Sequence, residues 1–543
     1  MKWFSKRGMM IVSIIFVACM VAALFVFSAY RYVVKPIVAS VMVNRGFRYY
    51  AGKDGHKDYK EAVKWYRKAA DLGNAHAMYS LGFFYDQGEG VAKDEAEAAK
   101  WYRKAADLGD TDGVTSLGVC YENGTGVPQN AAEAVKWYRK AARLGNTHAM
   151  VCLGYCCSRG QGVSTNYNDA AKWYRKAADL GDTDAIFKFG RCCATGEGVL
   201  MDEMEAIKWY RKAADLGHAK AMTSLGWYYE NGKSVPKDDK EAARWYRRAA
   251  ELGHAHAMSN LGNCYRNGIG VPKNEEEAVK WCRKAADLGD ADALFTLGWC
   301  YHHGVGVSTD IAEAVKLYHK AAEAGSTTAI YNLGWCYENG TGVSKDAAEA
   351  IKWYRKAADL GDADAMCYLG WCYNHGNGAS RDIAEATKWY RKAADLGEDT
   401  AMCNLGGFYE SGTGISKDIA EAVKWYRKAA YLGNSRAMNE LGKCCDNGTG
   451  VSKDKKEAAN WYRKAADLGH VAAMINLGVC YANGDGVQKD EVAALTWYSL
   501  AAAKDEHKTS FRDNLRKLMT PEQIAEAEKR VAEYLQKNKD LEK

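Results

Sequence analysis

The sequence predicts an all-α protein, a right-handed superhelical α-solenoid built from helix-turn-helix repeats. One helical pattern recurs every 36 residues along most of the 543-residue chain. The composition suits helices, with 48% hydrophobic residues and only 5 prolines. A fixed period of this length is typical of a solenoid and argues against several independent globular domains. We also expect an N-terminal transmembrane helix before the repeats and a C-terminal capping helix after them.

The recurring pattern is clearest between Asp94 and Gly109, D-E-A-E-A-A-K-W-Y-R-K-A-A-D-L-G. Asp94 is suited to the N-cap of a helix, and Glu97 is placed to complete a capping box. One apolar stripe, with spacings of three and four residues, is formed by Ala98, Trp101, Ala105 and Leu108. Gly109 supplies the left-handed residue that ends the helix.

The pattern divides the chain into five parts. Residues 1–7 form a short basic tail, 8–30 the expected transmembrane anchor, and 31–73 a degenerate N-terminal repeat that acts as a cap. Residues 74–505 hold twelve repeats, each with a first helix, a glycine turn and a second helix. Residues 506–543 form a C-terminal capping region, in which Thr520 to Gln523 reads as a capping box that opens a helix.

The 23 residues from Gly8 to Tyr30 carry no charge and are long enough to cross a bilayer. A cleaved signal peptide is the first alternative, although its apolar region usually spans only about 7–15 residues. Lipid attachment at Cys19 is the second. The charges on the two flanks favour, by a small margin, a single-pass protein with its N-terminus inside and its repeats exported.

Nine of the 17 cysteines occupy one column of the repeat, namely Cys120, Cys156, Cys192, Cys264, Cys300, Cys336, Cys372, Cys444 and Cys480. Equivalent positions in neighbouring repeats should lie roughly 8–10 Å apart. That separation exceeds the ~7 Å limit for the Cα atoms of a disulfide. We therefore expect small buried side chains, with disulfides or a metal site as the alternative.

These residues resemble the Sel-one-like repeat (SLR) family. The resemblance is carried by the pattern A-x-x-x-L-G-x-x-Y-x-x-G-x-G-V-x-x-D-x-x-E-A-x-x-W-Y-R-K-A-A-x-x-G, read from Ala77 to Gly109 and recurring in register over roughly four-fifths of the chain. The family is related to the tetratricopeptide repeat, so the resemblance implies a tetratricopeptide-like solenoid and a role in protein–protein interaction and complex assembly. Ser234, which replaces the second loop glycine, is expected to loosen its repeat locally.

The sequence shows no pattern that indicates catalysis. The G-x-G loops follow helices and lack the G-K-[ST] ending of a phosphate-binding loop. The net charge of +6 arises from interspersed Lys, Arg, Asp and Glu, which argues against nucleic-acid binding. We expect no enzyme activity, no cofactor, no metal site and no small-molecule substrate.

One column of the first helix varies instead of following the framework. It reads Phe83, Val119, Tyr155, Arg191, Trp227, Asn263, Trp299, Trp335, Trp371, Gly407, Lys443 and Val479, and is called the variable column below. Aromatic and amide side chains together are typical of recognition surfaces. The candidate partner-binding residues are Trp227, Phe295, Trp299, Tyr331, Asn332, Trp335, Trp371 and Asn404. The alternative is that these rings pack sideways against the neighbouring first helices.

These observations favour a membrane-anchored scaffold or adaptor that binds protein or peptide partners on the concave surface of the solenoid. The anchor would hold it to the membrane through residues 8–30. Two alternatives stay open: a hydrolase-like enzyme of the cell envelope acting through a site between repeats, and a purely structural spacer.

If residues 8–30 are an uncleaved anchor, the purified chain should require detergent and its intact mass should include Met1. The reason is that a bilayer-spanning helix remains part of the mature protein, whereas a signal peptide is removed. Intact-mass spectrometry checks this directly. A chain beginning near Arg31, or a lipid on Cys19, would contradict the anchor.

Overall fold

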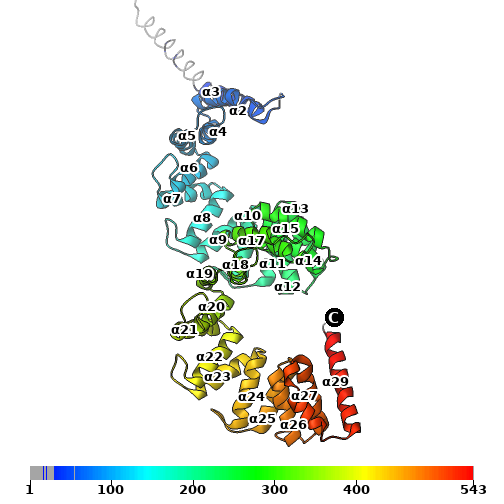
Figure 1. Ribbon diagram of the computed structural model, residues 1–543. Coiled ribbons are helices and arrows are strands. Elements are labelled where there is room, and N and C mark those ends of the chain that lie inside the picture. Colours follow the sequence, from blue (N-terminus) through cyan, green and yellow to red (C-terminus); the bar gives the residue numbers. More distant parts are fainter. Residues whose placement is uncertain (1–15, 17–19, 21–27, 29, 54, 542–543) are drawn as a thin grey trace, which may run out of the picture. The chain divides into compact units, whose positions relative to one another are not determined.

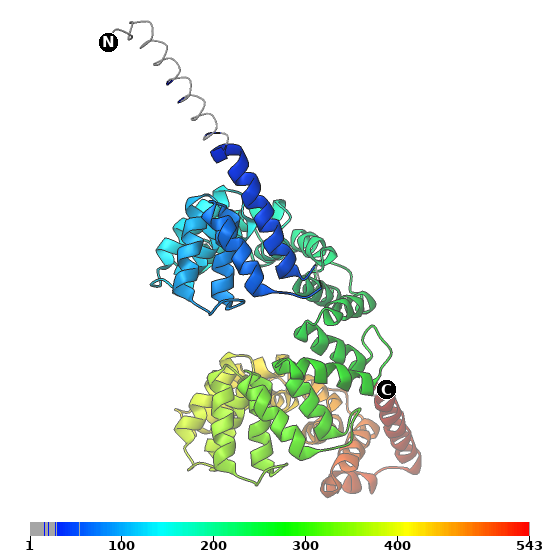
Figure 2. The ribbon, with the colours of Figure 1, turned by 90° about the horizontal axis from the view of Figure 1, so that it is seen from above.

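The computed structural model describes residues 16, 20, 28, 30–53 and 55–541. Every regular element in this part of the chain is a helix, and no strand is present in it. The chain divides into two compact units, one ending at Lys273 and the other beginning at Asn274. Within each unit, successive helix pairs pack one after another (Figures 1 and 2). The predicted all-α solenoid of repeated helix pairs is therefore confirmed.

In the first unit a short π-helical turn (Tyr30–Val34) leads into the first helix of the first pair. The first helices are α2 (Lys35–Ala51), α4 (Ala75–Gln87), α6 (Thr111–Asn123), α8 (Thr147–Arg159), α10 (Thr183–Thr195), α12 (Ala219–Asn231) and α14 (Ala255–Asn267). The second helices are α3 (Tyr59–Asp71), α5 (Glu95–Asp107), α7 (Ala131–Arg143), α9 (Tyr167–Asp179), α11 (Glu203–Asp215) and α13 (Asp239–Glu251).

The second unit begins with α15 (Glu275–Asp287), the second helix of its pair. Its first helices are α16 (Ala291–His303), α18 (Thr327–Asn339), α20 (Ala363–His375), α22 (Asp399–Ser411), α24 (Ser435–Asn447) and α26 (Val471–Asn483). The corresponding second helices are α17 (Ile311–Glu323), α19 (Ala347–Asp359), α21 (Ile383–Asp395), α23 (Ile419–Tyr431), α25 (Lys455–Asp467) and α27 (Glu491–Lys504). The chain ends in α28 (Ser510–Arg516) and α29 (Pro521–Leu541).

The predicted anchor lies outside the described residues, apart from Phe16, Met20, Ser28 and Tyr30. In the part of the chain that the structure covers, no helix combines the length and the apolar character that a membrane span needs. The anchor therefore stays a prediction.

In the turn between the two helices of a repeat, the backbone N–H of the N-cap residue has a different hydrogen-bond acceptor from the one that the sequence predicts. Asp94 caps α5 as predicted, with Oδ1 accepting from the backbone N–H of Glu97 at 2.9 Å. The backbone N–H of Asp94, however, donates to the carbonyl of Tyr85 at 2.9 Å. Glu97 therefore does not complete the capping box, and its carboxylate accepts from Lys100 Nζ at 3.0 Å instead. That half of the prediction is wrong because the preceding helix supplies the acceptor.

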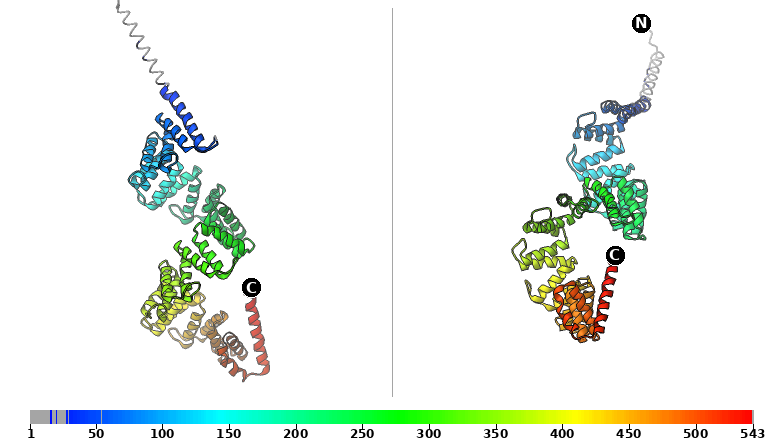
Figure 3. Two further views of the ribbon diagram at one scale, coloured as in Figure 1. Left: turned by 45° about the horizontal axis from the view of Figure 1, so that its top comes forward. Right: turned by 45° about the vertical axis from the view of Figure 1, so that its right-hand side comes forward.

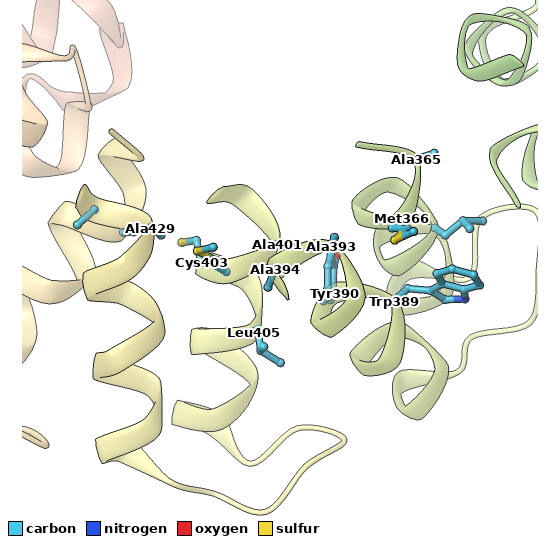
Figure 4. Close-up of a cluster of buried hydrophobic side chains, with 14 of the residues drawn as sticks. Ala365, Met366, Trp389, Tyr390, Ala393, Ala394, Ala401, Cys403, Leu405 and Ala429 are labelled. Atoms are coloured by element: carbon cyan, nitrogen blue, oxygen red, sulfur yellow. The ribbon is translucent and has the colours of Figure 1, made fainter. Parts of the chain in front are cut away.

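The core of a repeat is a contact between a tyrosine of the second helix and a glycine of the first, except in α15, where Cys282 takes the place of the tyrosine. Tyr102 is buried against Gly82, where an added Cβ would lie 2.5 Å from the tyrosine Cδ1. Ala105 and Ala106 follow on the same buried face, and their small size lets neighbouring helices approach closely. The same arrangement around Tyr390, Ala393 and Ala394 is shown in Figure 4.

Leu108, which the sequence placed on the apolar stripe, is 57% exposed. The side chain sits at the C-cap, just before Gly109 with its φ of +84°, so it projects beyond the helix end rather than into the core. The prediction for this position is wrong, and Tyr102 takes its place in the core. Trp101 is only partly buried, with Lys104 Nζ 3.8 Å from its ring centroid.

Consecutive repeats are joined by two recurring contacts. An arginine of one second helix donates to a tyrosine of the next first helix, as Arg283 does to Tyr301 Oη at 3.0 Å. The loop of each repeat also packs on the start of the preceding second helix. At Gly126 a Cβ would lie only 1.9 Å from the carbonyl oxygen of Glu95. A side chain at this loop position therefore needs a compensating contact.

Ser234 is the one non-glycine residue with a positive φ among the described residues, at 56°. Its Oγ donates to Glu203 Oε2 at 2.6 Å, and Lys233 Nζ pairs with the other oxygen of that carboxylate, also at 2.6 Å. The sequence predicts only that Ser234 loosens its repeat. The structure shows in addition that Ser234 and its neighbour Lys233 make two polar contacts with Glu203 of the preceding repeat.

The cysteine column is buried, as expected for small core side chains. Cys120, Cys156, Cys192, Cys264, Cys336, Cys372, Cys444 and Cys480 are buried free thiols, and Cys300 is equally buried. Burial raises the pKa of the Cys264 thiol to about 12 and that of Cys336 to about 11. These thiols therefore stay protonated and unreactive at neutral pH.

The last repeat is covered by α29, which packs beside α27 (Figure 3). Its capping box is complete, because Thr520 and Gln523 exchange hydrogen bonds of 3.0 and 3.3 Å. Ala527 is buried, and the Tyr534 ring lies 5.5 Å from that of Trp497.

Replacing Gly126 by Ala should destabilise the protein by about 3–5 kcal/mol, because the new Cβ combines overlap with Glu95 and an unfavourable φ of +69°. Gly145→Ala is the matched control, because its φ is +90° and no atom lies within 4 Å of the added Cβ. We expect it to cost only about 1–2 kcal/mol. Urea unfolding of both variants checks this, and equal losses would contradict it.

Stability should fall as the pH rises above about 9–10. Burial raises the pKa of Tyr174 from 10.0 to about 12, so the unfolded state ionises first and is stabilised by alkali. At pH 11 this one tyrosine should cost about 1.4 kcal/mol. Urea unfolding at pH 8 and 11 measures the effect, and Tyr174→Phe should reduce the loss of stability, although other buried tyrosines such as Tyr498, with its pKa raised to about 12, keep part of the pH dependence. A midpoint that does not change up to pH 11 would contradict it.

Candidate functional site

The aromatic residues of the variable column lie at the surface of the first helices. The exposed fractions are 44% for Trp227, 39% for Trp335 and 37% for Trp371. Trp299 is less exposed and stacks on His303 of the same helix, with ring centroids 4.3 Å apart. None of these four rings is fully buried, so they are available to a partner while retaining packing contacts.

The other candidate residues are held by neighbours in the same unit. Phe295 stacks on Tyr318 with centroids 5.7 Å apart. Asn332 donates from Nδ2 to the carbonyl of Thr328, one turn earlier in its own helix, at 2.8 Å. Trp335 contacts His302 of the preceding first helix at 5.7 Å between rings. The sideways packing that the sequence left as an alternative is therefore present, although it does not bury the ring.

Three candidate residues line a single hollow in the second unit. This Trp371 hollow, of about 470 Å³, lies over α18, α20 and α22 and is lined by Tyr331, Asp364, Cys367, Tyr368, Trp371, Glu398, Thr400 and Asn404. The tertiary structure therefore brings Tyr331, Trp371 and Asn404 together from three consecutive repeats. Asn404 Oδ1 accepts from Arg436 Nη1 at 3.3 Å, which fixes the amide at the edge.

A continuous series of rings supports this hollow. Tyr331 lies 5.4 Å from Tyr354, Tyr354 lies 4.6 Å from Tyr368, and Tyr368 lies 5.4 Å from Trp371. The Tyr354 hydroxyl donates to Glu338 Oε2 at 3.0 Å, and Tyr368 donates to the other oxygen of the same carboxylate. These hydrogen bonds hold the rings in place before any ligand arrives.

Carboxylates set the electrostatics of the Trp371 hollow. Glu398 caps α22 by accepting from the backbone N–H of Ala401. Burial, followed by the charge of Glu398, raises the pKa of the Cys367 thiol well above its usual range. Burial, followed by Asp364 and Asp362, also raises the pKa of Tyr331. Both shifts arise first from burial, and the nearby carboxylates add to them because their negative charge disfavours the ionised thiol and phenol.

The first unit contains an equivalent hollow exactly four repeats earlier in sequence. This Trp227 hollow, of about 500 Å³, is lined by Phe187, Tyr210, Lys220, Thr223, Ser224, Trp227, Tyr228, His254, His256 and Asn260. Phe187, Trp227 and Asn260 correspond to Tyr331, Trp371 and Asn404, each 144 residues apart.

The two hollows differ in charge. Lys220 and His254 stand where the second hollow has Asp364 and Glu398. Two hollows at the same repeat positions therefore present different chemistry to a ligand.

Sequence reasoning missed five residues that line the second hollow: Asp364, Cys367, Tyr368, Glu398 and Thr400. Several of them lie at the N-terminal ends of first helices, away from the variable column. Aligning the repeats could have pointed to these residues. The alignment shows variation one turn before the variable column and also at the first residues of the next repeat.

Fold and site together define an α-solenoid of helix-pair repeats with open hollows on its first helices. The Sel1 repeat family model matches thirteen tandem segments, at 39–74, 75–110, 113–146, 147–182, 183–218, 219–254, 255–290, 291–326, 327–362, 363–398, 399–434, 435–470 and 471–506. The chain belongs to the Sel1 repeat family, which confirms the resemblance. Proteins of this family generally mediate protein–protein interaction.

The chain is similar to the crystal structure of c5321, a protective antigen present in uropathogenic Escherichia coli strains displaying an SLR fold. The identity is 34%, over 87% of this chain and 94% of that chain, with a TM-score of 0.59. It is also similar to a Sel1 repeat protein from Oxalobacter formigenes, with 37% identity over 45% of this chain and 99% of that chain and a TM-score of 0.43. No curated protein matches the chain.

Proposed function

We propose that this chain is a membrane-anchored scaffold that binds extended segments of partner proteins along its first helices. The observation that carries the proposal is the pair of equivalent hollows, one in each unit, each with a half-exposed tryptophan at its edge. Exposed aromatic rings beside fixed amides are the usual anchors of protein recognition surfaces.

The proposed anchor is the uncharged segment 8–30, with the N-terminus inside and the repeats exported. The basic tail before this segment supports the orientation. The similar protein c5321 is described as a protective antigen present in uropathogenic Escherichia coli strains.

We propose further that the chain does not catalyse a reaction. A cysteine nucleophile needs a lowered pKa. Burial instead raises the pKa of Cys367, the cysteine that lines the Trp371 hollow, well above its usual range. The Trp371 hollow is therefore better suited to holding a partner than to activating this thiol as a nucleophile.

Trp335→Ala should weaken capture of partner proteins at least tenfold, because truncating a central aromatic anchor typically costs about 2 kcal/mol or more. The loss of stability should stay near 1 kcal/mol, since the ring is 39% exposed. Affinity capture from native membranes with the detergent-solubilised full chain, together with thermal melting, checks both effects.

Tyr431→Ala is the matched control, because this ring is 73% exposed but lies on a second helix. It should leave capture unchanged. Partners that are retained equally by both variants would contradict the proposed surface, and a loss of several kcal/mol for Trp335→Ala would make the ring a core residue.

A further inference from the structure

The three first helices around the Trp371 hollow contain no lysine or arginine. The sequences of α18, α20 and α22 are T-T-A-I-Y-N-L-G-W-C-Y-E-N, A-D-A-M-C-Y-L-G-W-C-Y-N-H and D-T-A-M-C-N-L-G-G-F-Y-E-S. They carry four carboxylates, and the N-caps of α20 and α22 add Asp362 and Glu398. Three consecutive first helices therefore place negative charge around one hollow without a compensating cation of their own.

The two carboxylates that line the hollow have no ion-pair partner in the described part of the chain. Asp364 is exposed, and Glu398 is partly exposed at the start of α22. The cation at the edge, Arg436 of α24, reaches Asn404 Oδ1 at 3.3 Å. Glu338 is already engaged by the hydroxyls of Tyr354 and Tyr368. Asp364 and Glu398 are thus left to pair with a charge from outside the chain.

Aromatic rings line the same hollow. Trp371 is 37% exposed, and its orientation is held by stacking on His375 at 4.7 Å and by Tyr368 at 5.4 Å. Tyr331 contributes a second ring from the preceding repeat. A cation is stabilised when it lies over the face of an aromatic ring, most of all over tryptophan. The planar guanidinium group of arginine can stack on such a ring while its N–H groups, which point outward in its own plane, donate to carboxylates.

We propose that the Trp371 hollow binds the guanidinium group of an arginine from an extended partner segment, stacked on Trp371 and paired with Asp364 and Glu398. This inference rests on the proposed scaffold function and specifies the partner chemistry at one site. Arginine fits better than lysine, because its flat fork of donors can meet carboxylates while its face covers a ring.

The Trp227 hollow provides an internal contrast. It keeps the tryptophan and the asparagine, but Lys220 stands at the position of Asp364 and His254 at that of Glu398. The carboxylate on its preceding first helix, Asp184, already pairs with Lys188 at 3.6 Å. This hollow therefore lacks the two carboxylates that an arginine needs, although its aromatic edge is the same.

The test uses the full-length chain in detergent and three fluorescein-labelled peptides of ten residues. Each is built from glycine and serine around one central residue: arginine, the uncharged isostere citrulline, or glutamate. Fluorescence anisotropy should show that the arginine peptide binds at least tenfold more tightly than the other two. Equal binding of the citrulline peptide, or no binding of the arginine peptide up to about 5 mM, would overturn the proposal.

Variants then locate the site. Trp371→Ala should reduce binding of the arginine peptide at least tenfold, and so should the double variant Asp364→Asn with Glu398→Gln, in which Gln retains an oxygen to cap α22. The matched control Trp227→Ala should leave binding unchanged. Unchanged binding in the double variant, or an equal loss with Trp227→Ala, would overturn the proposal.

Competition and folding controls complete the design. Spermidine, added to supply the same total positive charge as the arginine peptide, should displace that peptide poorly because it has no planar face. Displacement by spermidine as effective as that by the arginine peptide itself would overturn guanidinium recognition. Circular dichroism and thermal melting should confirm that each variant folds as the parent does. If the peptide test fails while partner capture still depends on Trp335, the scaffold proposal stands and arginine recognition does not.

Discussion

The contact between a glycine of the first helix and a tyrosine of the second helix, which recurs in all repeats but the one with Cys282, sets the spacing on which the rest of the stack depends. An added Cβ at Gly118 would lie 2.6 Å from Tyr138 Cε1, and one at Gly154 would lie 2.4 Å from Tyr174 Cε1. Only glycine lets the ring lie flat on the helix backbone. With the ring in place, its hydroxyl can donate to the first helix, as Tyr138 does to Glu122 at 2.5 Å, and the alanine pairs that follow are fully buried.

This contact also explains why the variable column, the proposed recognition surface, can vary. The glycine, the leucine before it and the cysteine column occupy the packed side of each first helix, so substitutions there would open cavities or cause overlaps. The variable column lies on the other side and carries no such constraint. Tryptophan, arginine, glycine and lysine all occur in it, at Trp227, Arg191, Gly407 and Lys443, while the helices keep the same length.

Each hollow is built from three consecutive repeats, so its chemistry depends on how their variable positions combine. In the second unit the combination gives aromatic rings with unpaired carboxylates, whereas in the first it gives rings with Lys220 and two histidines. A solenoid can thus change the chemistry of one hollow by a few exposed substitutions without altering the core. The two hollows share a tryptophan and an asparagine at equivalent positions but differ in charge.

The sequence by itself determined the helix pairs, their period, their caps and their turns. The caps and turns depend on residues within one turn of each other, as with Asp94 at an N-cap or Gly88 with its φ of +74° at a helix end, and the period follows from recurrence along the chain. It also identified the tryptophans of the variable column, because repetition separates framework from variation. Only the tertiary structure decided that Leu108 points to solvent, that Tyr85 takes the N–H expected for Glu97, and that Asp364 and Glu398 share a hollow with Trp371. The physical reason is that each of these outcomes depends on what a neighbouring helix offers across space, and that is not encoded in any local pattern.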